Sequence, residues 1–225
     1  VVAPGGNARQ AAEVALYCAW INGVVLPERK SKDGRKALRA IHLYGARDAR
    51  AFSAVRAQAE GNVLCRELTA LPPNELSPGA YRRRLRALAT ENRWKHEEFS
   101  FQKLRLMGAG AFCAVAQGSP VADAAIVHLR YSHAKAKRSI ALVGKGICYD
   151  TGGHNLKPAR YMFGMHEDMN GSAVALGILL AATRLINELG YRGASVQRIA
   201  AELNVTKGSF YHHLDAKDDL VIACY

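Results

Sequence analysis

VGKGICYDTGGHNLKPARYMFGMHEDMNGSA, residues Val143–Ala173, is the most informative stretch of this chain. It places two lysines and two aspartates, Lys145, Asp150, Lys157 and Asp168, at fixed spacings among glycines. Carboxylates on glycine-rich turns, with an amine beside them, supply the donors that a divalent cation needs. The stretch therefore predicts a metal-binding centre.

Length and composition predict one or two domains with a substantial core. The chain has 225 residues, of which 49% are hydrophobic. Its longest strongly apolar run, residues 173–182, is too short to span a bilayer, and no signal peptide is visible, so we expect no membrane segment. Five widely spaced cysteines without a CxxC pair favour reduced thiols in a cytoplasmic protein.

The formal net charge of +12 is unevenly distributed. Residues 187–225 hold four basic and five acidic side chains, so the excess lies earlier, much of it in Arg82–Arg86 and Lys135–Arg138. Such a balance could attract nucleic acid or another polyanion. We favour the simpler interpretation, which is solvated helix faces and a basic loop.

Helical and strand patterns alternate before the glycine-rich stretch. The patterns predict helices over 9–24, 48–71, 77–89 and 103–116, and strands over 37–44, 97–101, 125–131 and 139–143. Pro72-Pro73 should end the second helix, and Ser77-Pro78 resembles an N-cap followed by proline at the first helical position. This alternation predicts an α/β fold with a layered, mostly parallel sheet and flanking helices.

The glycine-rich stretch resembles the metal-binding centre of the leucyl (cytosol) aminopeptidases, a family of two-metal exopeptidases. Asn62–Ser77, NVLCRELTALPPNELS, is similar to the helix and double-proline turn that introduce the catalytic domain of that family. The resemblance covers residues of about 10–185 and is strongest from Asn62. It implies a metal-dependent hydrolase that removes N-terminal residues such as leucine from peptides, and a homo-oligomer.

The resemblance implies a role for each charged residue of the stretch. Lys145 would give a neutral amine to one metal, Asp150 would bridge two metals, and Asp168 would complete the more loosely held one. Lys157 would stay charged and stabilise the oxyanion that develops on the substrate carbonyl. The metal would be manganese or zinc. His154 and His166 are alternative metal ligands, although solvated or hydrogen-bonded imidazoles are the favoured interpretation.

One part of the family's metal site has no counterpart in this sequence. The family uses a later Asp-x-Glu-Gly-Arg segment for two further carboxylates and an arginine, and no such segment follows Asp168. Three ligands cannot hold two metals as a clamp on the attacking and the leaving atoms. We therefore expect one weakly bound ion with partial occupancy, and no catalysis by this chain alone.

A second resemblance begins before the first one ends. Residues of about 177–225, which include GYRGASVQRIAAELNVTKGSFYHHLDAKDDL, are similar to the DNA-binding domain of the TetR family of repressors. Its helices would span Ile178–Leu189, Val196–Leu203 and Lys207–Leu214, with Ser195 and Thr206 as N-caps. The spacing is that of a helix-turn-helix, which places its last helix in the major groove of DNA.

The resemblance to these repressors implies a set of DNA contacts. Lys207 and His212 would approach base edges in double-stranded DNA. The phosphate contacts would come from Thr206, Ser209, Tyr211 and Lys217. A three-helix bundle that binds nothing can present the same residues, so this alternative stays open.

The sequence thus predicts an α/β aminopeptidase-like region followed by a small all-α helix-turn-helix bundle. The predicted divisions are a partial N-terminal α/β region (1–61), a partial catalytic domain (62–185) and a helix-turn-helix domain (178–225). The overlap suggests a fusion, a frameshift, an assembly error or a designed chimera. The predicted function is that of an aminopeptidase with an incomplete two-metal site joined to a DNA-binding module. The alternative is a DNA-binding regulator module without peptidase activity.

Overall fold

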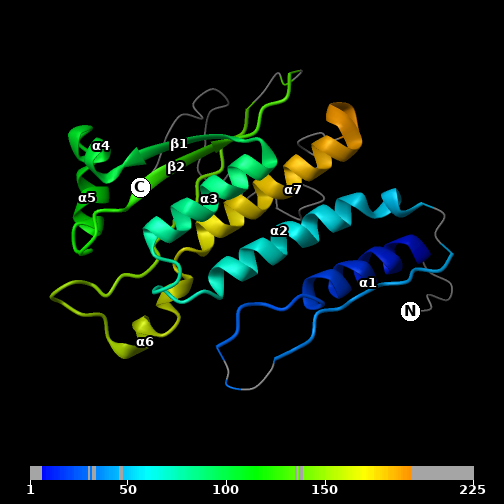
Figure 1. Ribbon diagram of the computed structural model, residues 1–225, viewed down its shortest axis with the longest axis horizontal. Coiled ribbons are helices and arrows are strands. Elements are labelled where there is room, and N and C mark those ends of the chain that lie inside the picture. Colours follow the sequence, from blue (N-terminus) through cyan, green and yellow to red (C-terminus); the bar gives the residue numbers. More distant parts are fainter. Residues whose placement is uncertain are drawn as a thin grey trace. The chain divides into compact units, whose positions relative to one another are not determined.

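The computed structural model describes residues 7–29, 31, 34–45, 48–134, 136 and 139–193. The elements in chain order are α1 (Ala8–Asn22), η1 (Ala49–Phe52), α2 (Ser53–Thr69), α3 (Pro78–Asn92), β1 (Lys95–Ser100), α4 (Phe101–Leu106), α5 (Gly110–Ala116), β2 (Ala125–Arg130), α6 (Ala159–Met162), η2 (Met165–Glu167) and α7 (Asn170–Gly193) (Figure 1). They belong to two units. Described residues up to Ala70 and from Ala173 onward form the first, and Leu71–Ser172 form the second.

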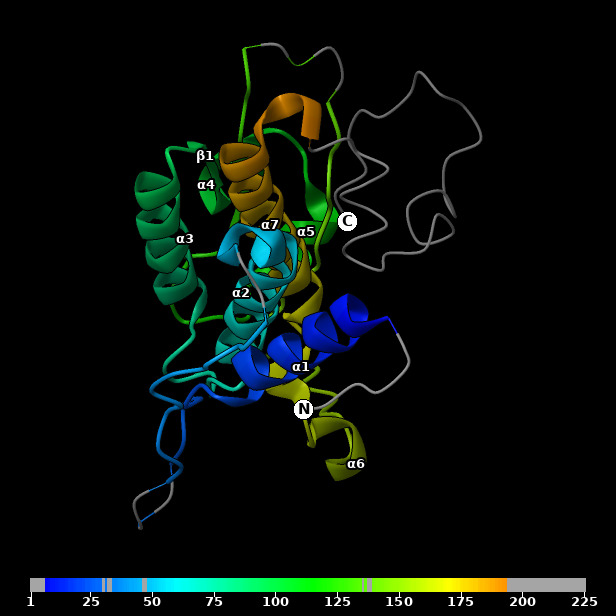
Figure 2. The same cartoon turned by 90° about the vertical axis from the view of Figure 1, so that its right-hand side faces the viewer.

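The first unit is built on α1, α2 and α7. Both views show α2 running beside α1 and beside α7 (Figures 1 and 2). Its core is a cluster of Ala57, Ala181 and Leu185, against which Ala54 and Ile186 pack. The alanines allow the two helices to approach closely, so that burial of their apolar stripes stabilises the pair.

The second unit places α3 against a two-stranded sheet. Strands β1 and β2 pair antiparallel, in a register that runs from Lys95 opposite Arg130 to Ser100 opposite Ala125. The α3 helix begins where the sequence predicts: Ser77 accepts a hydrogen bond from the Ala80 amide at 3.4 Å, and proline stands at the helix start. Its C-cap residue, Arg93, has a φ of 56°, and the turn leads directly into β1.

The helix predictions before Gly110 agree with the structure to within a few residues, with one break. The helix predicted over 103–116 is two helices, α4 and α5, because Gly108 adopts a φ of 78° between them. Glycine reaches this conformation without the steric cost that a side chain adds. The predicted strands at 97–101 and 125–131 are confirmed as β1 and β2.

The prediction of a mostly parallel sheet is wrong for the described residues. Their sheet has two strands, and the pair is antiparallel. Residues 37–44 and 139–143, which the sequence predicts as strands, form no ladder there. An alternating apolar pattern becomes a strand only when a neighbour satisfies its backbone groups. The apolar side chains of these two segments are substantially exposed, as Leu38, Ile41, Ile140 and Val143 show.

The α7 helix lies in an apolar segment that resembles a membrane span in length and composition. The segment Ala159–Glu188 is long enough and apolar enough to cross a membrane. The segment is not one continuous helix, since α6 and η2 precede α7 and Gly164 has a φ of 75°. Within α7, residues Ala173, Leu176, Leu180, Ala181 and Leu185 are buried. We therefore interpret α7 as a core helix.

Two of the three helices predicted for the helix-turn-helix, Val196–Leu203 and Lys207–Leu214, lie outside the described residues. Its first predicted helix coincides with part of α7, which contains a non-helical residue, Gly190. The described chain ends at residue 193. All six predicted DNA contacts, Thr206, Lys207, Ser209, Tyr211, His212 and Lys217, lie beyond it. The predicted division at residue 61/62 falls inside α2, whereas the first unit is divided from the second after Ala70.

Candidate metal centre

The glycine-rich stretch brings two of the predicted residues into direct contact. Lys145 Nζ lies 2.8 Å from each carboxylate oxygen of Asp168. Lys145 lies in a segment without regular secondary structure, and Asp168 lies at the end of the short helix η2, 23 residues later. The contact is partly open to solvent, because the Asp168 side chain is 31% exposed.

The other two predicted residues form a second pair. Lys157 Nζ donates to Asp150 Oδ2 at 2.8 Å, and its distance to the Met165 sulfur is 3.4 Å. The Gly152 amide donates to the other Asp150 oxygen at 2.9 Å. The hydrogen bond from Lys157, the Gly152 amide and the positive charges of Lys157 and Lys145 together lower the pKa of Asp150 below its ordinary value. Asp150 is therefore ionised at neutral pH.

Backbone packing fixes the distance between the Lys145 segment and the Asp168 turn. A Cβ on Gly144 would lie 2.5 Å from the Gly171 carbonyl oxygen, so no side chain fits between the two segments. The Ser172 amide donates to the Lys145 carbonyl oxygen at 2.8 Å. The Ser172 hydroxyl donates to the Met169 carbonyl oxygen at 2.7 Å. Gly144 is thus required here for close approach.

The donor set fits one divalent ion better than two. Lys145 and Asp168 are close enough for both to reach one ion, which would replace their present hydrogen-bonded ion pair. Asp150 adds a second ionised carboxylate. Within the described ranges, no three His, Cys, Asp or Glu side chains gather to hold an ion. A fully enclosed pair of ions needs more oxygen donors than these two carboxylates supply.

The remaining candidate ligands contribute little to this donor set. His154 is exposed, and His166 lies 3.9 Å from Glu167, next to the turn. Cys148 is buried, and burial, together with the negative charge of Asp123, raises the pKa of its thiol to about 11. A thiol that stays protonated is a poor nucleophile.

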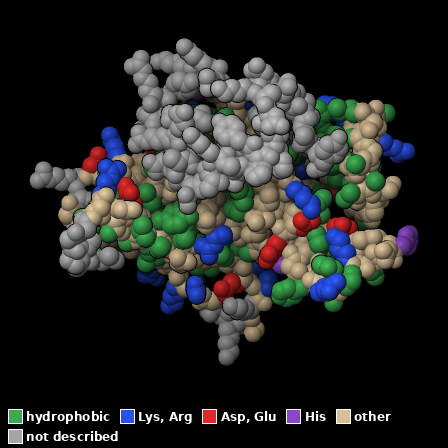
Figure 3. Space-filling model, turned by 180° about the vertical axis from the view of Figure 1, so that it is seen from behind, with side chains coloured by type: hydrophobic (Ala, Val, Ile, Leu, Met, Phe, Trp, Pro, Cys, Tyr) green, Lys and Arg blue, Asp and Glu red, His purple; other side chains and the backbone are tan. Residues whose placement is uncertain are grey.

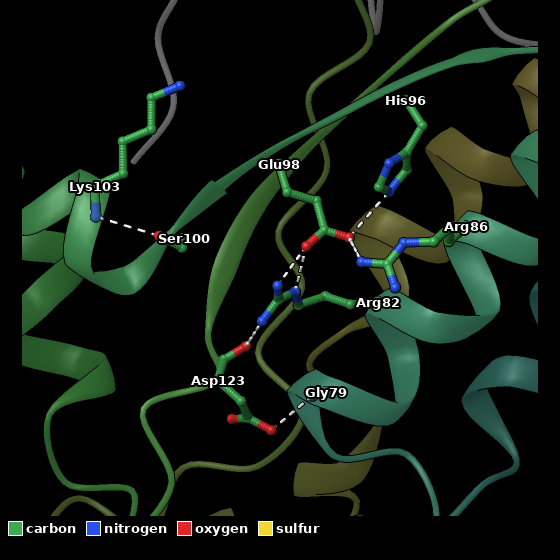
Figure 4. Close-up of polar contacts among 8 residues, drawn as sticks. All are labelled: Gly79, Arg82, Arg86, His96, Glu98, Ser100, Lys103 and Asp123. Carbon is green, nitrogen blue, oxygen red and sulfur yellow. Dashed lines mark hydrogen bonds and ion pairs between the residues drawn. The ribbon is translucent and has the colours of Figure 1, made fainter.

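The second unit contains a polar cluster around Glu98 that the sequence does not predict. Glu98 on β1 pairs with Arg82 and with Arg86 of α3, and His96 Nε2 lies 3.1 Å from it (Figure 4). Burial alone would raise the pKa of Glu98, but hydrogen bonds and charges from Arg82 and Arg86 lower it. The basic run Arg82–Arg86 is evident in the sequence, but its pairing with Glu98 of β1 is shown only by the fold.

This cluster weakens the case for a polyanion-binding surface. Two of the basic side chains of α3 are directed at Glu98 rather than at solvent alone. Figure 3 draws the molecule from behind, a view that does not show α3, and on that face too Lys and Arg side chains lie next to Asp and Glu side chains. Interleaved charges of both signs do not create a strong field for an anionic partner. The interpretation as solvated, ion-paired helix faces is therefore the better one for the described α3.

Comparison with protein families supports the aminopeptidase resemblance. Residues 63–202 match the family described as the cytosol aminopeptidase family, catalytic domain. A "Probable cytosol aminopeptidase" of Synechococcus sp. is 36% identical over 218 residues, which cover 92% of this chain and 43% of that protein. Another, from Corynebacterium diphtheriae, is 42% identical over 127 residues, or 56% of this chain and 25% of that protein. The chain thus spans less than half the length of these relatives.

Solved structures of similar fold point to the same family. A bottromycin maturation enzyme, BotP, in complex with Mn has a TM-score of 0.65 at 27% identity, over 81% of this chain and 39% of that one. Leucyl aminopeptidase from Trypanosoma brucei in complex with actinonin has a TM-score of 0.55 at 32% identity, over 59% of this chain and 26% of that one. The mixed α/β architecture is therefore that of aminopeptidase structures.

The comparisons give the predicted DNA-binding module no support. The family match continues to residue 202, which is inside the segment assigned to the helix-turn-helix. The Synechococcus alignment covers 92% of the chain, so it must include part of residues 178–225. The boundary that sequence analysis places at residue 185 is thus earlier than the end of the family match.

Proposed function

The chain belongs to the cytosol aminopeptidase family, and on this basis we propose that its glycine-rich stretch is the divalent-metal site of an aminopeptidase-like protein. Members of the family use divalent metals. In the proposed site Lys145, Asp150 and Asp168 hold the ion. Lys157 faces the substrate carbonyl. The contact between Lys145 and Asp168 is the observation that carries the proposal, because it places two donors where one ion can bind both.

Each residue has a chemical task in this proposal. The bound metal would polarise the peptide carbonyl as a Lewis acid. Asp150 and Asp168 offer carboxylate oxygens, and Lys145 offers an amine after losing a proton. Lys157 already touches Asp150 with a charged amine, and that charge would stabilise an oxyanion. The expected substrates are peptides with a free N-terminus.

We expect the 225-residue chain to bind one ion weakly and to hydrolyse no peptide. Two carboxylates and one amine leave most of a six-ligand shell to water. The expected ion is manganese or zinc, since a donor set of mixed oxygen and nitrogen suits both. A cytoplasmic location agrees with the relatives described as cytosol aminopeptidases, and the homo-oligomer is expected from the family resemblance alone. Both belong to this proposal.

Metal binding by the metal-free chain is the direct test. Calorimetry and Mn²⁺ electron paramagnetic resonance should show one Mn²⁺ per chain, and Asp168→Asn and Asp150→Asn should each lower the affinity at least tenfold. The control is Glu167→Gln, because Glu167 is adjacent to Asp168 and 66% exposed. Equal affinities in all four proteins would rule out the proposed site.

Peptidase activity needs its own measurement. A leucine anilide should give no turnover with added manganese or zinc at any concentration. Turnover that disappears in Asp150→Ala would show that the chain completes the site, and the expectation of inactivity would then be wrong.

The DNA-binding prediction remains a prediction from the sequence of residues 178–225. It would be supported by retention on double-stranded DNA that weakens with salt and with Lys207→Ala. Lys103→Ala, a lysine on α4, serves as the control. Retention that is equal in the wild type and both variants would count against the predicted recognition helix.

A further inference from the structure

Ser172 lies where the Lys145 segment meets the Asp168 turn. Its amide donates to the Lys145 carbonyl oxygen at 2.8 Å and is 3.1 Å from the Met169 carbonyl oxygen. Its hydroxyl donates to that same Met169 oxygen at 2.7 Å. Ser172 thereby joins the backbone of Lys145 to that of Met169, the residue that follows Asp168.

Tyr81 of α3 supports Ser172 from the opposite side. The two hydroxyl oxygens are 3.1 Å apart. A serine hydroxyl has a single proton, and that of Ser172 is donated to Met169. The Tyr81 hydroxyl is therefore the donor in the contact with Ser172. The Tyr81 side chain is buried, with 6% exposed, so its hydroxyl cannot exchange this partner for bulk water without cost.

The glycines around this contact pack closely against it. A Cβ on Gly146 would lie 3.0 Å from the Ser172 hydroxyl and 4.0 Å from the Tyr81 ring. A Cβ on Gly171 would lie 3.1 Å from the Lys145 amide nitrogen. The Tyr81 ring thus lies near Gly146, and its hydroxyl reaches the serine that fixes both ligand-bearing segments.

We propose that Tyr81 is a positioning residue for the metal centre: its hydroxyl holds Ser172, and Ser172 holds the segments of Lys145 and Asp168 together, so that one ion can reach both side chains. This inference rests on the proposed function, because it assigns the support of the same site. Tyr81 touches neither the ion nor the substrate. Outer groups of this kind orient metal ligands, and their loss weakens metal binding by about tenfold to a hundredfold.

The first experiment needs no metal. Tyr81→Phe keeps the ring and its packing but removes the hydroxyl. Hydrogen exchange of the metal-free protein should become faster at the Ser172 amide, which is bonded to Lys145, and stay unchanged at the α3 amides. Tyr149→Phe is the control, since Tyr149 lies beside Asp150 and is 41% exposed. Unchanged protection at Ser172 in Tyr81→Phe would overturn the inference.

The second experiment measures Mn²⁺ affinity by calorimetry, with the electron paramagnetic resonance line shape as an independent signature. Tyr81→Phe should bind Mn²⁺ about tenfold more weakly than the wild type and Tyr149→Phe. Ser172→Ala should lower the affinity at least as much, and Tyr81→Phe should add little to Ser172→Ala because both act through one contact. Ser172→Ala also serves if Tyr81→Phe fails to fold.

The outcomes separate this inference from the proposed function. If Asp168→Asn abolishes Mn²⁺ binding but Tyr81→Phe and Ser172→Ala bind like the wild type, the metal site stands and the positioning role is wrong. If Asp168→Asn has no effect, the proposed metal site is wrong, and the positioning role falls with it. Strictly additive losses in the two variants would also contradict a shared contact.

Discussion

Gly61 on α2 and Gly177 on α7 meet backbone to backbone. A Cβ on Gly61 would lie 2.5 Å from the Gly177 carbonyl oxygen, and a Cβ on Gly177 would lie 2.5 Å from the Gly61 carbonyl oxygen. The separation of the two helices at this point is therefore set by the absence of side chains. Seven residues further along α7, Arg184 pairs with Glu60 at 3.2 Å, so the contact is polar at its edge.

Gly61→Ala should destabilise the protein, although alanine favours helices by about 1 kcal/mol. The added methyl group must push apart two backbones, and overpacking of this kind costs about 1–3 kcal/mol. Urea unfolding followed by circular dichroism measures the loss. Gly110→Ala is the control, because a Cβ there has no neighbour within 4 Å. An equal or higher midpoint in Gly61→Ala would show that the helices are free to separate.

Leu185→Ala should lower the free energy of unfolding by about 2–4 kcal/mol. Leu185 is 2% exposed and packs with Ala57 and Ala181, so its truncation leaves a cavity between α2 and α7. Val174→Ala on the same helix is the control, since Val174 is 43% exposed. Similar losses in the two variants would contradict the interpretation of α7 as a helix of the core.

Glu98 should make stability depend on pH in the acid range. Its pKa is lower in the folded protein than in the unfolded chain, so its contribution is present above the unfolded pKa of about 4.3 and disappears as pH falls through the folded pKa. Glu98→Gln should flatten this part of the profile of unfolding free energy against pH. Glu97→Gln, whose side chain is 56% exposed, should leave it unchanged. A profile that is identical in wild type and Glu98→Gln would exclude this role.

Asp123 should stabilise the start of α3, although it lies 44 residues away from Gly79 in the sequence. Its Oδ2 accepts the Gly79 amide at 2.8 Å, next to the N-cap Ser77 (Figure 4). Asp123→Ala leaves this amide without its acceptor and should cost about 1 kcal/mol. Asp123→Asn keeps an acceptor oxygen and should lose less. Thermal unfolding at low salt compares them, and no difference between the alanine and asparagine variants would argue against the cap.

Local patterns determined much of the secondary structure and the family. Ser77-Pro78 marks a helix start in any surroundings, because its cap and its fixed φ act within one turn. The strands at 97–101 and 125–131 and the long helix that ends before Pro72 were predictable for the same reason. The register of Lys145, Asp150, Lys157 and Asp168 pointed to the aminopeptidases, and the family match agrees.

The tertiary structure alone decided which segments meet. The alternation of apolar and polar residues does not give the direction of the β1–β2 pairing. It also does not show that 37–44 and 139–143 form no strands, since a strand depends on a neighbour that local sequence does not specify. The same holds for the contacts of Glu98 with Arg82 and of Tyr81 with Ser172. Residue types and spacings set what each segment can form by itself, whereas contacts across tens of residues depend on the path of the whole chain.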